Sequence, residues 1–351
     1  MRSMRKMVGV LGAAVAIAVS VAACGSGGGS TDAAGKPVVR IMVGGLDKQI
    51  YLPAMLAQQL GFYAQQGLDV RLSDEPAGVN AETDMIAGQI DGVIGFYDHN
   101  IDLQAKGKST EEVAQLLQVP GEVELCRSDE PAITSPADWH GKSLGITDLG
   151  SSTDFLTKYL AVRNGVPVTD IHELGVQAGP TFIAAMQHKS IDCGMTTEPT
   201  VSRLLDSGQA RIIVDTRTTA GARAALGGAY PASSLYMTTD YVNGHKDVVQ
   251  KLVNAYVETL NWIQTHSAAQ ITDKMPAAYY AGTGKAAYVK ALGHEIGMYD
   301  PNGIMPPDGP RTVLGVLSAF NPEVKNVDLT KTYDNEFAAA ADRTFHIVAA
   351  S

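Results

Sequence analysis

The sequence predicts an α/β protein of two lobes with mainly parallel sheets, joined by two crossings of the chain. Its length of 351 residues corresponds to about two domains. Strand-like and helical segments alternate in two successive runs, which is typical of βαβ units. In each run, a helix end and the following strand carry the same three residues at the same internal spacing, first Met85, Ile90 and Asp91, then Met186, Ile191 and Asp192.

Composition excludes several classes of protein. Hydrophobic residues make up 45% of the chain and charged residues 18%, enough apolar surface for a core. The net charge of −10 argues against a nucleic-acid-binding protein, which usually has a basic face. Three cysteines are too few for a disulfide scaffold. Only one apolar run approaches membrane-spanning length, so a multi-span membrane protein is excluded.

That run lies at the N-terminus and has the features of a secretory signal. Three cations precede residue 7, and residues 7–23 are uncharged and rich in Ala and Val. Cys24 directly follows a small-residue site, an arrangement that resembles the lipobox of bacterial lipoproteins. The alternative is an ordinary signal peptide with an incidental cysteine. We expect residues 1–23 to be removed and Cys24 to carry lipid, which would anchor the chain to the outer face of the cell membrane. Residues 24–36 would form a flexible Gly/Ser tether.

The elements of the first run begin after Pro37. Residues 38–43 are rich in β-branched residues and end at Gly44-Gly45, which predicts a strand and a turn. Apolar residues at helical spacing follow over residues 50–63. The remaining predicted elements of this run are a strand at 68–72, a helix at 81–87 and a strand at 90–96.

The second run repeats this order, and a helical block follows it. The predicted elements of the second run are strands at 143–147, 171–176 and 191–196 and helices at 154–163 and 182–188. After it come a strand at 234–239 and helices at 246–266, 285–296 and 312–320. We expect the chain to cross between lobes near 120–135 and 215–235. Residues 38–125 and 232–351 would form lobe I, residues 130–225 would form lobe II, and the cleft between them would close like a hinge.

Two further cysteines, Cys126 and Cys193, lie 67 positions apart. They could pair in an oxidising compartment, but sequence alone shows no contact between them. We expect two separate buried thiols.

Motifs for catalysis are absent from the sequence. It has no G-x-S-x-G, no P-loop and no full G-x-G-x-x-G, and His294-Glu295 lacks the second histidine of a zinc hydrolase because Met298 stands there. The histidines are dispersed and no cysteines cluster, so we expect no metal site, no cofactor and no enzyme activity.

Four loops are candidates for binding a ligand. Ser151, Ser152 and Thr153 follow a strand and open a helix, where amides and hydroxyls favour an anionic group, although a simple helix cap fits equally well. Two further groups of residues follow the carboxyl ends of predicted strands, where ligands bind in α/β sheets. Each group could instead be the start of a helix with no role in binding. The first is Tyr97, Asp98 and His99; the second is Thr197 and Glu198. Tyr230, near the second crossing, would face either the core or the cleft.

Taken in order, these segments resemble a known family. Leu52-Pro53, Gly61-Phe62-Tyr63, Gly88-Gln89-Ile90-Asp91, Gly150-Ser151-Ser152 and Thr196-Thr197-Glu198-Pro199 are similar to motifs of the solute-binding proteins of NitT/TauT-type (nitrate/sulfonate/taurine) ABC importers. The resemblance covers about residues 38–320. It implies the NMT1/THI5-like, type II periplasmic-binding-protein fold and a ligand cleft that also includes Gly45, Leu46, Gln49 and Tyr51.

The resemblance also implies a function. The chain would capture a small organic solute, such as a sulfonate, a carboxylate, an aromatic acid or a thiamine-pyrimidine-like compound, and deliver it to ABC permease subunits with a cytoplasmic ATPase. Nitrate fits less well, because these loops contain no obvious arginine. Two alternatives stay open: a thiamine-pyrimidine-synthase-like enzyme, whose cysteine-rich motif this chain lacks, and a lipoprotein that senses solute without transport. We expect a monomer.

Overall fold

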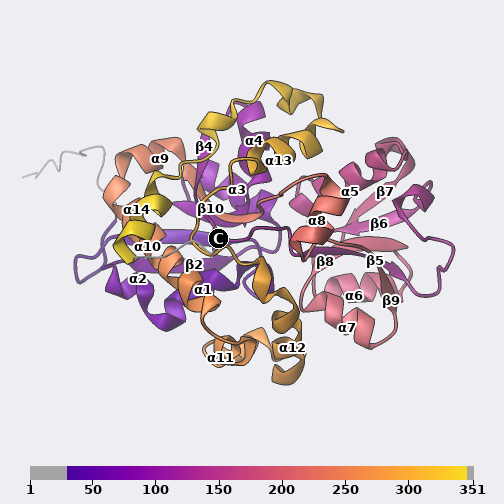
Figure 1. Ribbon diagram of the computed structural model, residues 1–351, viewed down its shortest axis with the longest axis horizontal. Coiled ribbons are helices and arrows are strands. Elements are labelled where there is room, and N and C mark those ends of the chain that lie inside the picture. Colours follow the sequence, from indigo (N-terminus) through magenta and orange to yellow (C-terminus); the bar gives the residue numbers. More distant parts are fainter. Residues whose placement is uncertain (1–29, 346–351) are drawn as a thin grey trace, which may run out of the picture.

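The computed structural model describes residues 30–345, which fold into two lobes built on one five-stranded sheet each (Figure 1). The predicted signal peptide and the lipidation site at Cys24 lie outside the described residues. The first lobe has the strand order β2-β1-β3-β10-β4, with β2 Asp69–Asp74, β1 Val38–Val43, β3 Gly92–Phe96, β10 Ser233–Thr238 and β4 Thr110–Gln115. The second lobe has the order β7-β6-β8-β5-β9, with β7 His172–Gly175, β6 Ser143–Ile146, β8 Cys193–Thr197, β5 Glu122–Arg127 and β9 Ala210–Asp215.

The two sheets have the same arrangement of strand directions. In each sheet four strands run one way and one strand runs against them, so the sheets are mixed, with most strands in one direction. The reversed strand is β10 in the first sheet and β5 in the second, and each arrives from the other lobe. The α/β prediction of two related lobes is confirmed.

The repeated aspartate has the same task in both lobes. Asp91 accepts a hydrogen bond from the backbone N–H of Arg40 in β1 at 2.7 Å, and Asp192 accepts one from the backbone N–H of Ser143 in β6 at 2.9 Å. Each also binds an arginine, Arg40 and Arg127 respectively. The carboxylate therefore ties the start of the third strand of each run to the start of the first.

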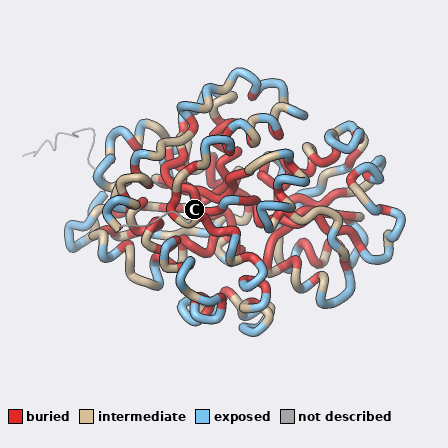
Figure 2. Tube along the Cα trace, in the orientation of Figure 1, coloured by how far each residue is buried: buried red, intermediate tan, exposed pale blue. Residues whose placement is uncertain are grey.

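Helices cover both faces of each sheet. The helices between the strands of the first lobe are α1 Leu52–Leu60, α2 Phe62–Gln65, α3 Gly78–Ile86 and α4 Asp98–Ala105. Those of the second lobe are α5 Ser152–Arg163, α6 Pro180–Gln187, α7 Thr200–Asp206 and α8 Thr219–Leu226. Short 3-10 helices are Gln49–Tyr51, Pro136–Asp138, Val168–Asp170, Ala277–Tyr279, Ile296–Met298, Pro322–Asn326 and Leu329–Lys331. Buried residues run through the middle of both lobes (Figure 2).

The C-terminal helical block packs mainly on the first lobe. It consists of α9 Thr239–Gly244, α10 Lys246–Gln264, α11 Ala268–Thr272, α12 Lys285–Glu295, α13 Gly309–Ser318 and α14 Glu336–Phe345. The long helix α10 lies against α1, α2 and α14. The block also touches the second lobe, because α13 packs on α5 and Phe320 lies 6.0 Å from Phe155 between ring centroids. Within residues 30–345, no helix has both the length and the apolar character needed to cross a membrane.

The first crossing is shorter and earlier than predicted. The expected boundary assigns residues 122–125 to lobe I, but β5 pairs with β8 and β9 and so belongs to the sheet of the second lobe. The chain crosses between Gln115 and Glu122, and it returns between β9 and β10. Sequence analysis missed β5 because Glu122 and Glu124 suggest an exposed segment, whereas all six of its residues are buried.

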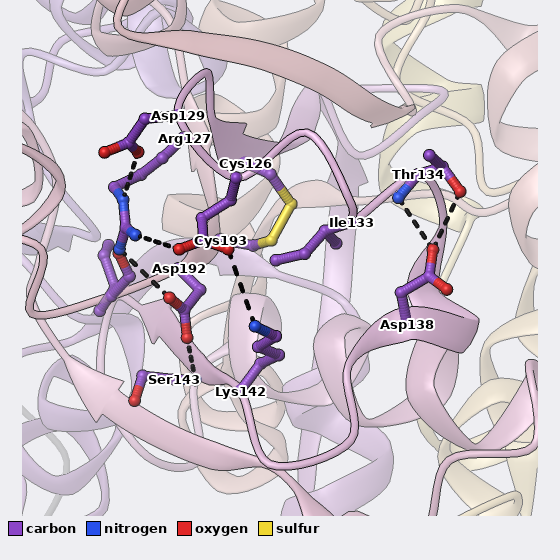
Figure 3. A network of polar contacts seen from close by, with 12 residues as sticks. Cys126, Arg127, Asp129, Ile133, Thr134, Asp138, Lys142, Ser143, Asp192 and Cys193 are labelled. Atoms are coloured by element: carbon purple, nitrogen blue, oxygen red, sulfur yellow. Dashed lines mark hydrogen bonds and ion pairs between the residues drawn. A yellow bond between two sulfur atoms is a disulfide. The ribbon is translucent and has the colours of Figure 1, made fainter.

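The expectation of two separate thiols is wrong: Cys126 and Cys193 form a disulfide (Figure 3). Both residues are completely buried, as expected. They face each other directly in the antiparallel pairing of β5 with β8, with Cα atoms 3.9 Å apart. The missed strand β5 explains this error, because without it no contact between the two cysteines is visible.

Candidate functional site

Polar side chains from both lobes meet in a small pocket between the carboxyl ends of the strands. Its volume open to the centre of a water molecule is about 20 Å³, room for roughly one water. The pocket is lined by Lys48, Ile50, Tyr51, Gly78 and His99 from the first lobe and by Glu122, Thr147, Ser151, Ser152, Thr153, Ala178, Thr196 and Thr197 from the second. A solute larger than water would therefore enter only when the lobes separate.

The N-terminus of α5, with Ser151, Ser152 and Thr153, forms one wall of the pocket. Ser151 precedes the helix without capping it, since its hydroxyl donates to the carbonyl of Asp148 at 2.6 Å. Thr153 accepts from the backbone N–H of Thr147 at 2.8 Å. The first amides of a helix have no intrahelical acceptor and carry the positive end of the helix dipole. These amides are therefore suited to hold an anionic or acceptor group.

Asp98 connects the two lobes through buried hydrogen bonds. Its Oδ1 accepts from the hydroxyl of Ser152 at 2.9 Å, and its Oδ2 accepts from the hydroxyl of Tyr230 at 2.9 Å. Asp98 and Tyr230 are both fully buried. Burial raises the pKa of Asp98, while His99 and the two hydroxyl donors oppose that shift. Asp98 thus joins the two lobes by hydrogen bonds. Tyr230 does not line the pocket, and its hydroxyl holds the carboxyl group of Asp98 in position.

His99 lines the pocket and lies beside a buried carboxyl group. Its Nδ1 lies 2.5 Å from Oε1 of Glu82, off the line of an ideal hydrogen bond, and its Nε2 lies 3.5 Å from the Ser152 hydroxyl. Burial lowers the pKa of His99, but the carboxylates of Glu82, Asp98 and Asp102 outweigh it and raise the pKa to about 9. The serine–histidine–glutamate series resembles a catalytic triad, but a charged imidazole is no base for the serine.

Sequence analysis missed Lys48 and Glu122. Lys48 is 8% exposed, and its Nζ donates to the carbonyls of Gly44 and Pro76 at 2.7 and 2.8 Å. Burial lowers the pKa of Lys48, and Glu122 is the first of the carboxylates that oppose this shift. Glu122 begins the undetected strand β5. In the sequence, each of these two residues is recognisable only as a charged side chain beside an apolar segment. Such a charge usually indicates a solvent-exposed turn.

Of the four residues after β1 that the family resemblance implied as cleft residues, only Tyr51 lines the pocket. Tyr51 lines the pocket and packs edge-on against Phe96. Gly45, at φ +114°, gives room to Lys48, whose Cε would lie 2.6 Å from a Cβ at that position. Leu46 and Gln49 do not line the pocket. Leu46 donates its backbone N–H to Asp74, and Gln49 donates its own to the Glu198 carbonyl of the other lobe at 3.2 Å.

The structure does not bring Tyr97 or Glu198 into this pocket. Tyr97 is completely buried in the first lobe, where its hydroxyl lies 2.5 Å from that of Thr332, so it belongs to the core. Glu198 accepts hydrogen bonds from Ser202 and Arg217 and lines a neighbouring cavity, with a volume of about 120 Å³, that shares Lys48 and Ala178 with the pocket. The alternative of a helix start with buried rings is therefore the correct one for Tyr97.

Thr197 and its neighbour Thr196 complete the wall from β8. The Thr197 hydroxyl donates to the carbonyl of Gly121 in the first crossing at 3.1 Å. The Thr196 hydroxyl and Oε2 of Glu122 are buried and have no hydrogen-bond partner in the described part of the chain. Both atoms belong to residues that line the pocket, so both are available to a ligand there. No group of three or more metal-binding side chains occurs among residues 30–345.

Solved structures with the same fold are numerous. A structure from Bordetella bronchiseptica RB50 is 34% identical, matches with a TM-score of 0.84, and covers 88% of this chain and 98% of its own. The alkanesulfonate-binding protein SsuA from Xanthomonas axonopodis pv. citri, bound to MOPS, is 19% identical with a TM-score of 0.67 and covers 87% of this chain and 97% of its own. At that identity the second likeness establishes the fold alone.

Comparisons of the sequence with known proteins identify a family and two curated relatives. The chain spans 65% and 50% of the length of two curated relatives. One of these, the 4-amino-5-hydroxymethyl-2-methylpyrimidine phosphate synthase of Legionella pneumophila (strain Philadelphia 1), is 29% identical over 160 residues, or 42% of this chain. The family model described as NMT1/THI5 like matches residues 50–314, which include all but one of the residues that line the pocket. The chain therefore belongs to the NMT1/THI5-like family.

Proposed function

We propose that this chain is an extracytoplasmic solute-binding protein that captures a small organic solute between its lobes and delivers it to the permease of an ABC importer. The observation that carries the proposal is the pocket itself. Both lobes contribute polar groups to it, and buried polar atoms of Thr196 and Glu122 have no hydrogen-bond partner among residues 30–345. A solute in this position would contact both lobes at once and so favour their closure.

Few polar contacts hold the lobes together across the cleft. They include the Ser152–Asp98 hydrogen bond, the Gln49–Glu198 backbone hydrogen bond and an exposed ion pair between Lys290 of α12 and Asp206 of α7 at 3.2 Å. The exposed pair contributes little. Opening the cleft therefore breaks a small number of bonds, and a solute that spans the pocket would replace them.

The anchor and the mode of action belong to the same proposal. Cys24 would carry lipid after removal of residues 1–23, and the Gly/Ser segment that follows would let the lobes reach a permease in the same membrane. The chain would act by binding and not by catalysis. The raised pKa of His99 disfavours this residue as a base for Ser152.

A thermal-shift screen of organic sulfonates, carboxylates, aromatic acids and aminopyrimidines tests the proposal, with calorimetry on every hit. A ligand at one hundred times its Kd stabilises the folded chain by about 2.7 kcal/mol. Ser152→Ala should weaken the hit, while Ser190→Ala, at an exposed position outside the pocket, should not. Binding that is equally strong in both variants would place the solute elsewhere, and a screen without hits would contradict the proposal.

A further inference from the structure

Glu122 has a buried carboxyl group whose hydrogen-bonding capacity is unused. The residue is 4% exposed and lines the pocket at the point where the chain enters the second lobe. Its Oε2 has no hydrogen-bond partner among residues 30–345. An unpaired buried carboxyl group costs free energy. The buried carboxyl group of Asp98, by contrast, accepts hydrogen bonds from two hydroxyls. A donor from outside the chain would remove that cost.

The charges around Glu122 determine its protonation. Burial, with Asp98 adding to it, raises the pKa of Glu122 to about 8, while Lys48 and His99 act in the opposite direction. Burial raises the pKa of Tyr51, Tyr230 and Glu124, and Glu122 adds to each of these shifts. At neutral pH the carboxyl group is therefore mostly protonated. Lys48 and His99 are the basic groups that act on Glu122, and Asp98 is the acid that acts on it.

This balance restricts what can bind beside Glu122. A group with a positive charge and N–H donors would supply the missing hydrogen bond to Oε2. The proton of Glu122 would leave as that group arrives, so that the number of buried charges of each sign stays matched. A charge-assisted hydrogen bond of this kind is stronger than a neutral one.

We propose that Glu122 selects solutes with a protonated nitrogen, an ammonium or an amidinium, and that it releases its proton when such a solute binds. The inference rests on the proposed function and defines the chemistry of the solute at one end of the pocket. The opposite end, at the N-terminus of α5, remains available for an acceptor or an anionic group.

Matched pairs of compounds test the selection. The probes are 2-aminoethanesulfonate with ethanesulfonate, 3-aminopropanoate with propanoate, and benzamidine with benzamide. At least one nitrogen cation should bind ten times more tightly, or better, than its uncharged or nitrogen-free partner. Calorimetry at pH 7 in buffers of different ionisation heat should show about one proton released per solute bound, and affinity should rise about tenfold between pH 6 and pH 7.

Two variants show whether the released proton comes from Glu122 or from another group. Glu122→Gln should bind the same cation at least tenfold more weakly and release no proton. Glu112→Gln, which removes a buried carboxyl group from β4 in the first lobe, should behave like the parent. The proton count on the parent protein needs no variant, so a poorly folded Glu122→Gln does not stop the test.

The outcomes are distinct. Equal binding of both members of every pair, or binding of the cation without proton release, would overturn the role of Glu122. If a nitrogen-free anion binds between the lobes, the proposed function stands and this inference fails. If no probe of either kind binds, the result contradicts both.

Discussion

Replacing Cys126 and Cys193 together with alanine should destabilise the protein strongly. The disulfide closes a loop with a sequence separation of 67. For a loop of that length, the lost chain entropy of the unfolded state corresponds to about 4 kcal/mol at 25 °C. Whole proteins are commonly stable by about 5–15 kcal/mol, so the loss is a large share of the total. Because the bridge joins β5 to β8, the second lobe should lose stability first.

Urea unfolding of the parent and of the double alanine variant measures the difference. We expect the variant to be less stable by about 2–4 kcal/mol, within the range found for native disulfides. Reductant added to the folded parent should act slowly, because both sulfurs are completely buried. A difference below about 1 kcal/mol, or peptide mapping that finds Cys126 and Cys193 as free thiols in unreduced protein, would refute the reasoning.

Three further predictions concern the pocket and the anchor. Ser152→Ala should weaken binding of the identified solute about tenfold or more, since hydrogen bonds near charged groups contribute ~1.5–3 kcal/mol, whereas Tyr97→Phe should bind like the parent in calorimetry. Glu122 has a raised pKa in the folded chain, so folding loses stability as pH rises from about 4.5 to about 8. Glu122→Gln should therefore gain stability relative to the parent over that range in melts at pH 5 and pH 8; a constant difference would contradict this. Cys24→Ala should abolish palmitate labelling, and persistent label would exclude Cys24 as the lipid site.

Local periodicity predicted the βαβ segments well. The strand predicted at 191–196 is β8, Cys193–Thr197, and the helix predicted at 246–266 is α10, Lys246–Gln264. These segments place apolar residues at the spacing that their buried faces require. The strands β4 and β5 escaped prediction because each carries two glutamates, which usually indicate an exposed segment, whereas Glu112, Glu122 and Glu124 are buried.

The candidate site also has residues that the sequence could predict and residues that it could not. The Ser151–Thr153 turn could be predicted, since a strand, a hydroxyl-rich turn and a helix place amides at one edge of the sheet. The sequence could place His99 near the pocket. It could not show that the pKa of His99 is raised, because this depends on Glu82 from a different helix. Tyr97 was misassigned because the sequence does not show on which side of the strand end its ring lies; the structure turns it toward Thr332.

Solute-driven closure of the two lobes tests the central claim most directly. Val79 of the first lobe lies next to Gly150 of the second, since a Cβ at Gly150 would be 3.3 Å from Cγ2 of Val79. The exposed neighbours Asn80 and Leu149 can therefore carry paired spin labels after substitution by cysteine. Pulsed electron resonance would be recorded with and without the solute found by calorimetry, in protein whose Cys24 is replaced by serine. We predict a broad distribution of distances without solute and a shorter, narrow one at saturation. An unchanged distribution in the presence of proven binding would contradict capture between the lobes.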